Sequence, residues 1–327
     1  MPFRRLCACW RQTIAAFAIL LTAASACAQA WPQRPVKLIV SFAPGGGADI
    51  VARLLAPGLA EALGQSVVVE NRVGGGGAIG TEAVVRAAPD GNTLLVSGKS
   101  EITLLPNLLT TPPYDAEKDL APLMLVAAVP TVIAVHPSVN AQGLRELVAL
   151  SRTAALPYGT VGHGSLMHIA MEILNTKVHG QFLHIPYKGG APAVADLLGG
   201  QIGVAVVNTP PLMAHLKARK VRALAVLQNE RSPLLPEVPT AKEVLGLDDI
   251  ATPAWFAIFA PARTPAAVLA RLETELARLL QAPESRTRLE QAGFEVVGLR
   301  GVGFAETIRR ESTYYRDAIK RYAIRPE

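Results

Sequence analysis

The sequence predicts an α/β protein whose parallel sheets are covered by helices. Two observations carry this prediction. Short apolar runs of β-type residues alternate along the chain with stretches in which apolar residues recur at helical spacing. In addition, 50% of the 327 residues are hydrophobic, which is enough to fill the cores of two α/β domains.

Each element follows from a local pattern. Residues 36–41 form the first apolar run, and the helix after it has apolar residues at helical spacing from Ile50 to Leu63 before Gly64 ends it. Further strands are expected at residues 65–70, 93–97, 158–161, 182–186, 202–207 and 221–227, and helices at 81–88, 143–153, 165–178 and 192–198. The C-terminal part is expected to be helical, with apolar stripes at 269–280 and 304–322.

Two β-type segments are suited to joining two lobes. The run 123–135 is interrupted by Pro130, as in a segment that crosses between lobes, and residues 254–260 would return the chain to the first lobe. We therefore expect residues 31–132 plus 255–327 to form lobe 1 and residues 133–254 to form lobe 2.

The first 30 residues have the pattern of a secretory signal peptide. Three arginines precede an apolar stretch that is too short to span a bilayer, and Ala28-Gln29-Ala30 fits a cleavage site. All three cysteines lie in this segment, so we expect no disulfide, thiol nucleophile or cysteine metal site in the mature chain. Cys27 leaves lipidation of the N-terminus as an alternative. The expected location is the periplasm, after cleavage near Ala30.

The charge balance excludes one class of partner. The formal net charge is +6, which is mild, and three of the positive charges lie in the signal segment. The other basic residues are scattered along the chain, so we expect no nucleic-acid partner.

Two strand-to-helix loops are candidate seats for an anion. In each, an apolar run passes through glycines into a helix, whose unpaired backbone N–H groups would face a ligand at the positive end of the helix dipole. The candidate contacts are Phe42, Pro44, Gly45, Gly46, Gly47 and Asp49 in the first loop, and Gly162, His163, Gly164, Ser165 and His168 in the second. The alternatives are an ordinary turn in which Asp49 caps the helix, and a purely structural cap at Ser165.

Further candidates lie at the edge where α/β sheets bind ligands: Ser97 ends the expected strand 93–97, and Lys99, Glu101 and Asn208 each follow a strand. Lys99 could pair with a carboxylate or be solvated, and Asn208 would be a polar contact from the second lobe. Trp255 could line the cleft or pack in the core.

Other functions compete with ligand capture. Ser165 with His168 invites a serine hydrolase interpretation, although the Gly-x-Ser-x-Gly nucleophile elbow is absent. Residues 75–80 match G-x-G-x-x-G, but they follow the second strand, and a tight turn explains them better than a dinucleotide site. The six histidines show no metal-binding spacing. We therefore expect neither a metal nor a cofactor.

The order of short motifs resembles that of the Bug family of extracytoplasmic solute receptors, which is associated with tripartite tricarboxylate transporters. The matching segments run from end to end: residues 31–40, 42–46, 49–53, 70–72, 74–80, 88–91, 158–168, 186–190, 197–201, 221–225 and 235–240. The resemblance implies a two-lobed periplasmic binding protein, type II-like, that closes like a flytrap on a small organic acid. It implies no enzymatic activity.

In this family, the ligand carboxylate is held by backbone amides and water. The resemblance assigns that role to residues 42–47 and 162–165, and it makes His168 a residue that shapes the pocket. The implied partners are a small mono- or dicarboxylate and a membrane permease or a sensor, and the receptor is expected to be a monomer. Two departures concern the loops: Ala43-Pro44 replaces a double proline, and Lys99 and Glu101 stand where the family has small or neutral residues.

Overall fold

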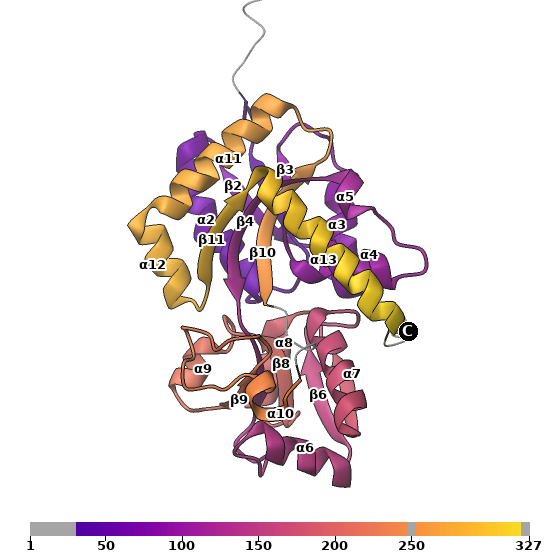
Figure 1. Cartoon of the computed structure of the whole chain (residues 1–327). Coiled ribbons are helices and arrows are strands. Elements are labelled where there is room, and N and C mark those ends of the chain that lie inside the picture. The colour runs from indigo at the N-terminus through magenta and orange to yellow at the C-terminus, as the bar shows by residue number, and fades with distance from the viewer. Residues whose placement is uncertain (1–30, 248–252, 322–327) are drawn as a thin grey trace, which may run out of the picture.

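The computed structural model describes residues 31–247 and 253–321, so the predicted signal peptide and Cys27 lie outside the described residues. Figure 1 shows two lobes, each built around one sheet with helices against it. One sheet has the order β11-β4-β10-β3-β1-β2 and the other the order β7-β6-β8-β5-β9. No helix in these two ranges is long and apolar enough to span a membrane.

The first lobe contains the six-stranded sheet. Its strands are β1 (Val36–Val40), β2 (Val67–Asn71), β3 (Thr93–Gly98), β4 (Leu120–Val129), β10 (Ala254–Pro261) and β11 (Glu295–Arg300). Its helices are α2 (Gly47–Leu63), α3 (Ala78–Val85), α4 (Leu105–Leu108), α5 (Ala116–Asp119), α11 (Ala266–Gln281), α12 (Pro283–Gln291) and α13 (Gly301–Arg321). A short 3-10 turn, η1 (Gly75–Gly77), precedes α3, and a π-helical turn, η2 (Ser100–Leu104), follows β3.

The second lobe contains the five-stranded sheet. Its strands are β5 (Thr131–Val135), β6 (Leu156–Thr160), β7 (Phe182–Pro186), β8 (Val204–Asn208) and β9 (Arg222–Val226). Its helices are α6 (Leu144–Thr153), α7 (Leu166–Val178), α8 (Gly190–Leu198), α9 (Met213–Lys217) and α10 (Ala241–Leu245). Every residue of β5 and β8 is buried, as the continuous apolar runs of these segments require.

The prediction of parallel sheets is wrong for five of the nine strand pairs in the part of the chain that the structure describes. Strand β1 pairs in parallel with β2 and β3, but β10 pairs antiparallel with β3 and β4, and β11 is antiparallel to β4. In the second sheet, β5 is antiparallel to β8 and β9. The reason lies in the connections: β4 leaves the first lobe and β10 returns to it, so these two neighbours run in opposite directions.

The chain changes sheets at Pro130. Strand β4 ends at Val129 in the first sheet, and β5 begins at Thr131 in the second. The carbonyl oxygen of Pro130 accepts a hydrogen bond from the backbone N–H of Thr209 at 3.1 Å, which ties the crossing point to the end of β8. The second crossing lies between β9 and β10.

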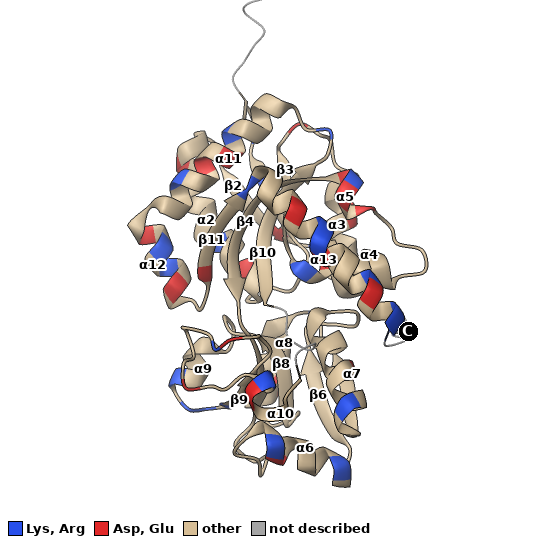
Figure 2. Ribbon diagram, in the orientation of Figure 1, with Lys and Arg blue, Asp and Glu red and all other residues tan. Residues whose placement is uncertain are grey.

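The C-terminal part is not wholly helical, contrary to the sequence prediction. Strand β11 lies between α12 and α13 and forms the edge of the first sheet against β4. Gly298 has a φ of 70°, and the pairing of β11 with β4 is irregular around it. This irregularity hides the alternation that would identify a strand. Figure 2 shows both signs of charge interspersed along α11, α12 and α13.

Candidate functional site

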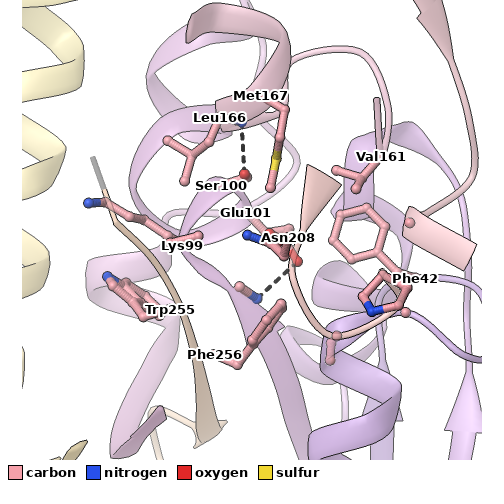
Figure 3. Close-up of a pocket in the computed structure, with 17 residues that line it drawn as sticks. Phe42, Lys99, Ser100, Glu101, Val161, Leu166, Met167, Asn208, Trp255 and Phe256 are labelled. Carbon is pink, nitrogen blue, oxygen red and sulfur yellow. Dashed lines mark hydrogen bonds between the residues drawn. The ribbon is translucent and has the colours of Figure 1, made fainter. Parts of the chain in front are cut away.

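A small cavity of about 30 Å³ lies where the two lobes meet. A water molecule needs about 10–15 Å³, so the space suffices for roughly two waters. The lining residues come from both lobes: Phe42, Gly46, Gly47, Ala48, Gly98, Lys99, Ser100, Glu101, Val161, Leu166, Met167, Gly190, Asn208, Pro211, Ala254, Trp255 and Phe256. Figure 3 shows their arrangement.

Helix α2 begins at the wall of this cavity. Gly46 is its N-cap, and Gly47 and Ala48 are its first two residues. A side chain at Gly47 would come within 2.5 Å of the Phe256 ring, so the close approach of helix and ring requires glycine here. The first-turn N–H groups of α2 have no partner within the helix and lie at the positive end of its dipole.

Asp49 supports the first loop without lining the cavity. Its carboxylate accepts hydrogen bonds from the Gly45 N–H at 2.8 Å, the Asn71 amide at 2.9 Å and the Arg53 guanidinium at 2.9 Å. Burial raises the pKa of Asp49, but these hydrogen bonds outweigh it and lower the pKa overall. Pro44 and Gly45 are exposed and do not line the cavity either.

Helix α7 brings a second N-terminus to the same cavity, from the other lobe. Ser165 is its N-cap, and the Ser165 hydroxyl accepts a hydrogen bond from the His168 N–H at 3.3 Å. The next two residues, Leu166 and Met167, line the cavity. Gly162, His163, Gly164, Ser165 and His168 do not line it; Gly162 and His163 instead line a neighbouring pocket with glycines 74–77.

A third helix start faces the cavity and was not selected from the sequence. Gly190 is the first residue of α8 and lines the cavity, and its N-cap Gly189 has a φ of 135°. The Gly189-Gly190 pair after the apolar run 182–186 could have indicated this helix start, because it repeats the strand, glycine and helix pattern of the two predicted anion-binding loops.

Lys99 lines the cavity, but its charge is paired with Glu311. Its ammonium lies 2.8 Å from a Glu311 carboxylate oxygen and 5.6 Å from the centre of the Tyr315 ring. It also donates a hydrogen bond to the Pro253 carbonyl at 3.3 Å. Burial lowers the pKa of Lys99, and Glu311 opposes that shift. In Figure 3 the side chain points away from Glu101 and Asn208.

Glu101 is the buried acid of the cavity, with 1% of its surface exposed. Its Oε1 accepts hydrogen bonds from the hydroxyls of Ser41 (2.7 Å) and Ser97 (2.8 Å) and from the Gly98 N–H (3.2 Å). Its Oε2 has no hydrogen-bond partner among the described residues. Burial is the largest influence on Glu101 and raises its pKa.

Ser97 therefore acts on Glu101 and not on the cavity itself, which it does not line. Asn208 does line the cavity, and its amide donates to the Thr131 hydroxyl at 3.3 Å. Trp255 both lines the cavity and packs in the core: its indole N–H donates to Glu311 at 2.8 Å. The two roles that the sequence left open for Trp255 are thus combined.

The glycine motif at residues 75–80 and the Ser165–His168 pair, which suggested a dinucleotide site and a hydrolase, have structural explanations. A Cβ at Gly80 would lie 2.7 Å from the Ser41 Cα and the Arg72 carbonyl oxygen, so close packing of α3 against β1 accounts for the glycine. Ser165 is fully buried, and its hydroxyl is occupied by the cap of α7. The hydrolase alternative thus has no accessible nucleophile at Ser165.

Three histidines gather beside the cavity. His163 comes from the loop between β6 and α7, His168 from the first turn of α7 and His184 from β7. The ring centroids of His168 and His184 are 4.0 Å apart. Burial is the largest influence on both rings, and with neighbouring histidines it lowers the pKa of His168 to about 3 and that of His184 to about 4.

The lobes touch around the cavity. Among the described residues, four hydrogen bonds join them: Ala43 N–H to Lys188 carbonyl (3.1 Å), Leu166 N–H to Ser100 hydroxyl (3.0 Å), Thr209 hydroxyl to Gly293 carbonyl (3.0 Å) and Ser232 hydroxyl to Glu295 carboxylate (2.9 Å). The conformation is therefore one in which the lobes are drawn together over a nearly filled space.

Comparisons with known proteins identify the family of this chain. A family model described as the tripartite tricarboxylate transporter family receptor matches residues 51–323. BugT of Bordetella pertussis is 38% identical over 266 residues, which cover 79% of this chain and 80% of BugT. The structure of the periplasmic binding protein BugD matches with a TM-score of 0.86 at 32% identity, covering 91% of this chain and 100% of BugD.

Two similar structures contain ligands. Rpa4515 of R. palustris, solved with adipate, has a TM-score of 0.86 at 31% identity and covers 91% of this chain and 100% of its own. MatC of Rhodopseudomonas palustris, with bound malate, has a TM-score of 0.83 at 31% identity and covers 88% and 100%. The chain described here therefore belongs to the tripartite tricarboxylate transporter receptor family, the Bug-type solute-binding proteins.

Proposed function

We propose that this chain is a non-enzymatic periplasmic receptor that captures a small organic carboxylate between its two lobes. The observation that carries the proposal is that first-turn residues of α2 in one lobe, and of α7 and α8 in the other, line a single cavity. Each helix N-terminus is equivalent to about half a positive charge with free N–H donors. Adipate and malate in two relatives support an acid as ligand.

The contacts proposed for the carboxylate are the backbone N–H groups at Gly47 and Ala48 in the first lobe and at Gly190 in the second, because the N–H groups of Gly46 and Leu166 already donate to the Ala43 carbonyl and the Ser100 hydroxyl. Asn208 would add a side-chain donor. Pro44, Gly45, Asp49 and Ser165 would hold the loops in shape. Uncharged N–H donors bind an anion through charge-assisted hydrogen bonds that contribute about 1.5–3 kcal/mol each. A few such bonds give enough affinity to capture the ligand and still allow it to be released.

Capture is proposed to proceed by closure. The lobes, divided at about residues 132 and 254, would part to admit the acid and then close on it, restoring contacts such as Leu166 N–H to Ser100. Only a ligand that binds the closed form better than the open form can drive this change. The closed receptor would be recognised by a membrane permease, or by a sensor.

Glu101 supports a ligand with a second polar group. Burial raises the pKa of the Glu101 carboxyl group and so favours its neutral form, and in that form the proton would lie on Oε2 because Oε1 already accepts three hydrogen bonds. The Oε2 hydroxyl would then donate to a second carboxylate or a hydroxyl of the ligand. Lys99 is not proposed as a ligand contact, because Glu311 holds its charge.

The decisive experiment identifies the ligand directly. Protein purified without added ligand is denatured, and the released small molecules are identified by mass spectrometry; mono-, di- and tricarboxylates are then titrated calorimetrically. We expect one acid per chain with a micromolar dissociation constant, and tighter binding of dicarboxylates or hydroxy acids than of matched monocarboxylates. Binding of cationic or uncharged solutes with no response to any carboxylate would overturn the proposal.

A further inference from the structure

The histidine cluster beside the cavity is not used by carboxylate capture. His163, His168 and His184 each offer a ring nitrogen, and the three nitrogens lie within 4.8 Å of one another. The rings of His163 and His168 are 4.6 Å apart, and those of His168 and His184 are 4.0 Å apart. Such a grouping of three imidazoles from two separate segments is the ligand set that divalent transition metals prefer.

The surroundings of the cluster resemble those of a metal site. His168 Nε2 faces a Glu172 carboxylate oxygen at 3.9 Å, and that oxygen accepts a hydrogen bond from the Tyr158 hydroxyl at 3.1 Å. A metal-bound histidine is usually oriented through its second nitrogen by a carboxylate. The Thr160 hydroxyl, 2.7 Å from His184 Nε2, plays the same positioning part for His184.

Metal binding requires a modest rearrangement. In a tetrahedral site with metal–nitrogen bonds of about 2.0–2.1 Å, ligand nitrogens are about 3.3 Å apart, so the rings must rotate inward. His168 Nδ1 would give up its long 3.3 Å contact with the Gly164 N–H. Both His163 and His184 are partly exposed, and β7 is an edge strand, so an ion and a water ligand can reach the cluster.

We propose that His163, His168 and His184 bind one divalent transition-metal ion of the zinc type, with Glu172 orienting His168. The ion would tie the loop between β6 and α7 to the edge strand β7. Since Val161 and Leu166 flank this loop and line the cavity, a bound metal would stiffen the second-lobe side of the ligand site. The class of metal ion follows from the neutral imidazole donors, because these favour zinc, copper and nickel over magnesium or calcium.

The test uses the chain without a polyhistidine tag, stripped with chelator and titrated with Zn²⁺ by calorimetry, with melting temperature as a second readout. We expect one Zn²⁺ per chain and a rise in melting temperature. His184→Gln, which lies at a partly exposed position, should weaken Zn²⁺ binding at least tenfold, and His163→Gln should do likewise. His215→Gln, outside the cluster on α9, is the matched control and should bind as the parent does.

Two outcomes overturn the proposal: no saturable Zn²⁺ binding to the parent chain, or equal losses in His215→Gln and His184→Gln. A misfolded variant is recognised by its melting temperature in chelator, where His184→Gln should remain close to the parent. The carboxylate and metal proposals are tested by different variants. Gly47→Ala disturbs the loop at residues 42–47, which is proposed to bind the carboxylate, and it should leave Zn²⁺ binding intact.

Discussion

The ammonium of Lys99 lies 2.8 Å from Glu311 on α13, and both groups are buried or nearly so. The indole N–H of Trp255 donates to the same carboxylate at 2.8 Å. The positive charge of Lys99, which follows β3 beside the cavity, is thereby neutralised within the protein. The electrostatics of the cavity are then set by helix N-termini and by Glu101.

Replacement of Lys99 should separate structure from ligand binding. We expect Lys99→Met to keep ligand affinity within about twofold. Glu311→Gln should lower the free energy of unfolding by about 3 kcal/mol, because the lysine charge would remain buried without an anionic partner. Calorimetric titration and urea denaturation measure the two effects. A large affinity loss in Lys99→Met with normal stability would make Lys99 a ligand contact after all.

Glu101 should discriminate among ligands. Glu101→Ala removes the donor proposed for the ligand's second polar group, and a hydrogen bond to a charged group contributes about 1.5–3 kcal/mol, so dicarboxylate affinity should fall roughly 10- to 150-fold. Glu101→Gln keeps an N–H donor and should lose less. Monocarboxylate affinity serves as the control, because neither variant should change it strongly; equal losses for both ligand classes would contradict the assignment.

The first turn of α2 can be tested sterically. In Gly47→Ala the new methyl group would meet the Phe256 ring at 2.5 Å, which must shift the loop or the ring. Such overpacking costs about 1–3 kcal/mol, and if this cost falls on the bound form, carboxylate affinity should drop by about 5- to 150-fold. Gly143→Ala is the matched control, since a methyl group there meets nothing within 4 Å. Unchanged affinity in Gly47→Ala would exclude this loop as the anion seat.

Closure depends in part on the hydrogen bond from Leu166 N–H to Ser100. A hydrogen bond of this kind contributes about 0.5–1.5 kcal/mol, so Ser100→Ala should weaken ligand binding about 2- to 12-fold and raise the radius of gyration of the ligand-free protein. Ser138→Ala also loses one side-chain hydrogen bond, but within the second lobe, and should change neither quantity. Calorimetry and small-angle X-ray scattering provide the two measurements.

Acid should destabilise the metal-free protein through the histidine cluster. His168 and His184 have pKa values of about 3 and about 4 in the folded state. The ordinary histidine value is about 6.5, so below that pH the unfolded chain binds more protons than the folded one. Stability is therefore complete above about pH 6.5 and falls with acidification by at most about 1.4 kcal/mol per pH unit for each histidine.

This pH effect is measured by urea denaturation in chelator between pH 7 and pH 5. The variant His184→Gln should flatten the slope, since it removes one of the two groups that resist protonation. His179→Gln, at the exposed end of α7, should leave the slope unchanged. A parent slope no steeper than that of His184→Gln would show that the cluster does not govern acid stability.

Features that depend on residues close together in the chain could be predicted from the amino-acid sequence. The alternation of β-type runs with helical stripes predicted an α/β fold, and the glycine loops before residues 47 and 166 predicted helix starts facing a ligand. These signals are local, because a strand, a turn and a helix start are each specified by a few consecutive residues. The order of short motifs was enough to indicate the family.

Contacts between distant segments depend on how the elements pack in three dimensions. Lys99 pairs with Glu311, which is 212 positions away, and the antiparallel strand β10 reaches its place only after the chain has built the second lobe. His184 joins His163 and His168 because β7 lies beside β6. Such pairings follow from how whole elements pack, and they cannot be predicted from the spacing of residues along the chain. For this reason the partner of Lys99 and the grouping of the three histidines could not be predicted from the sequence.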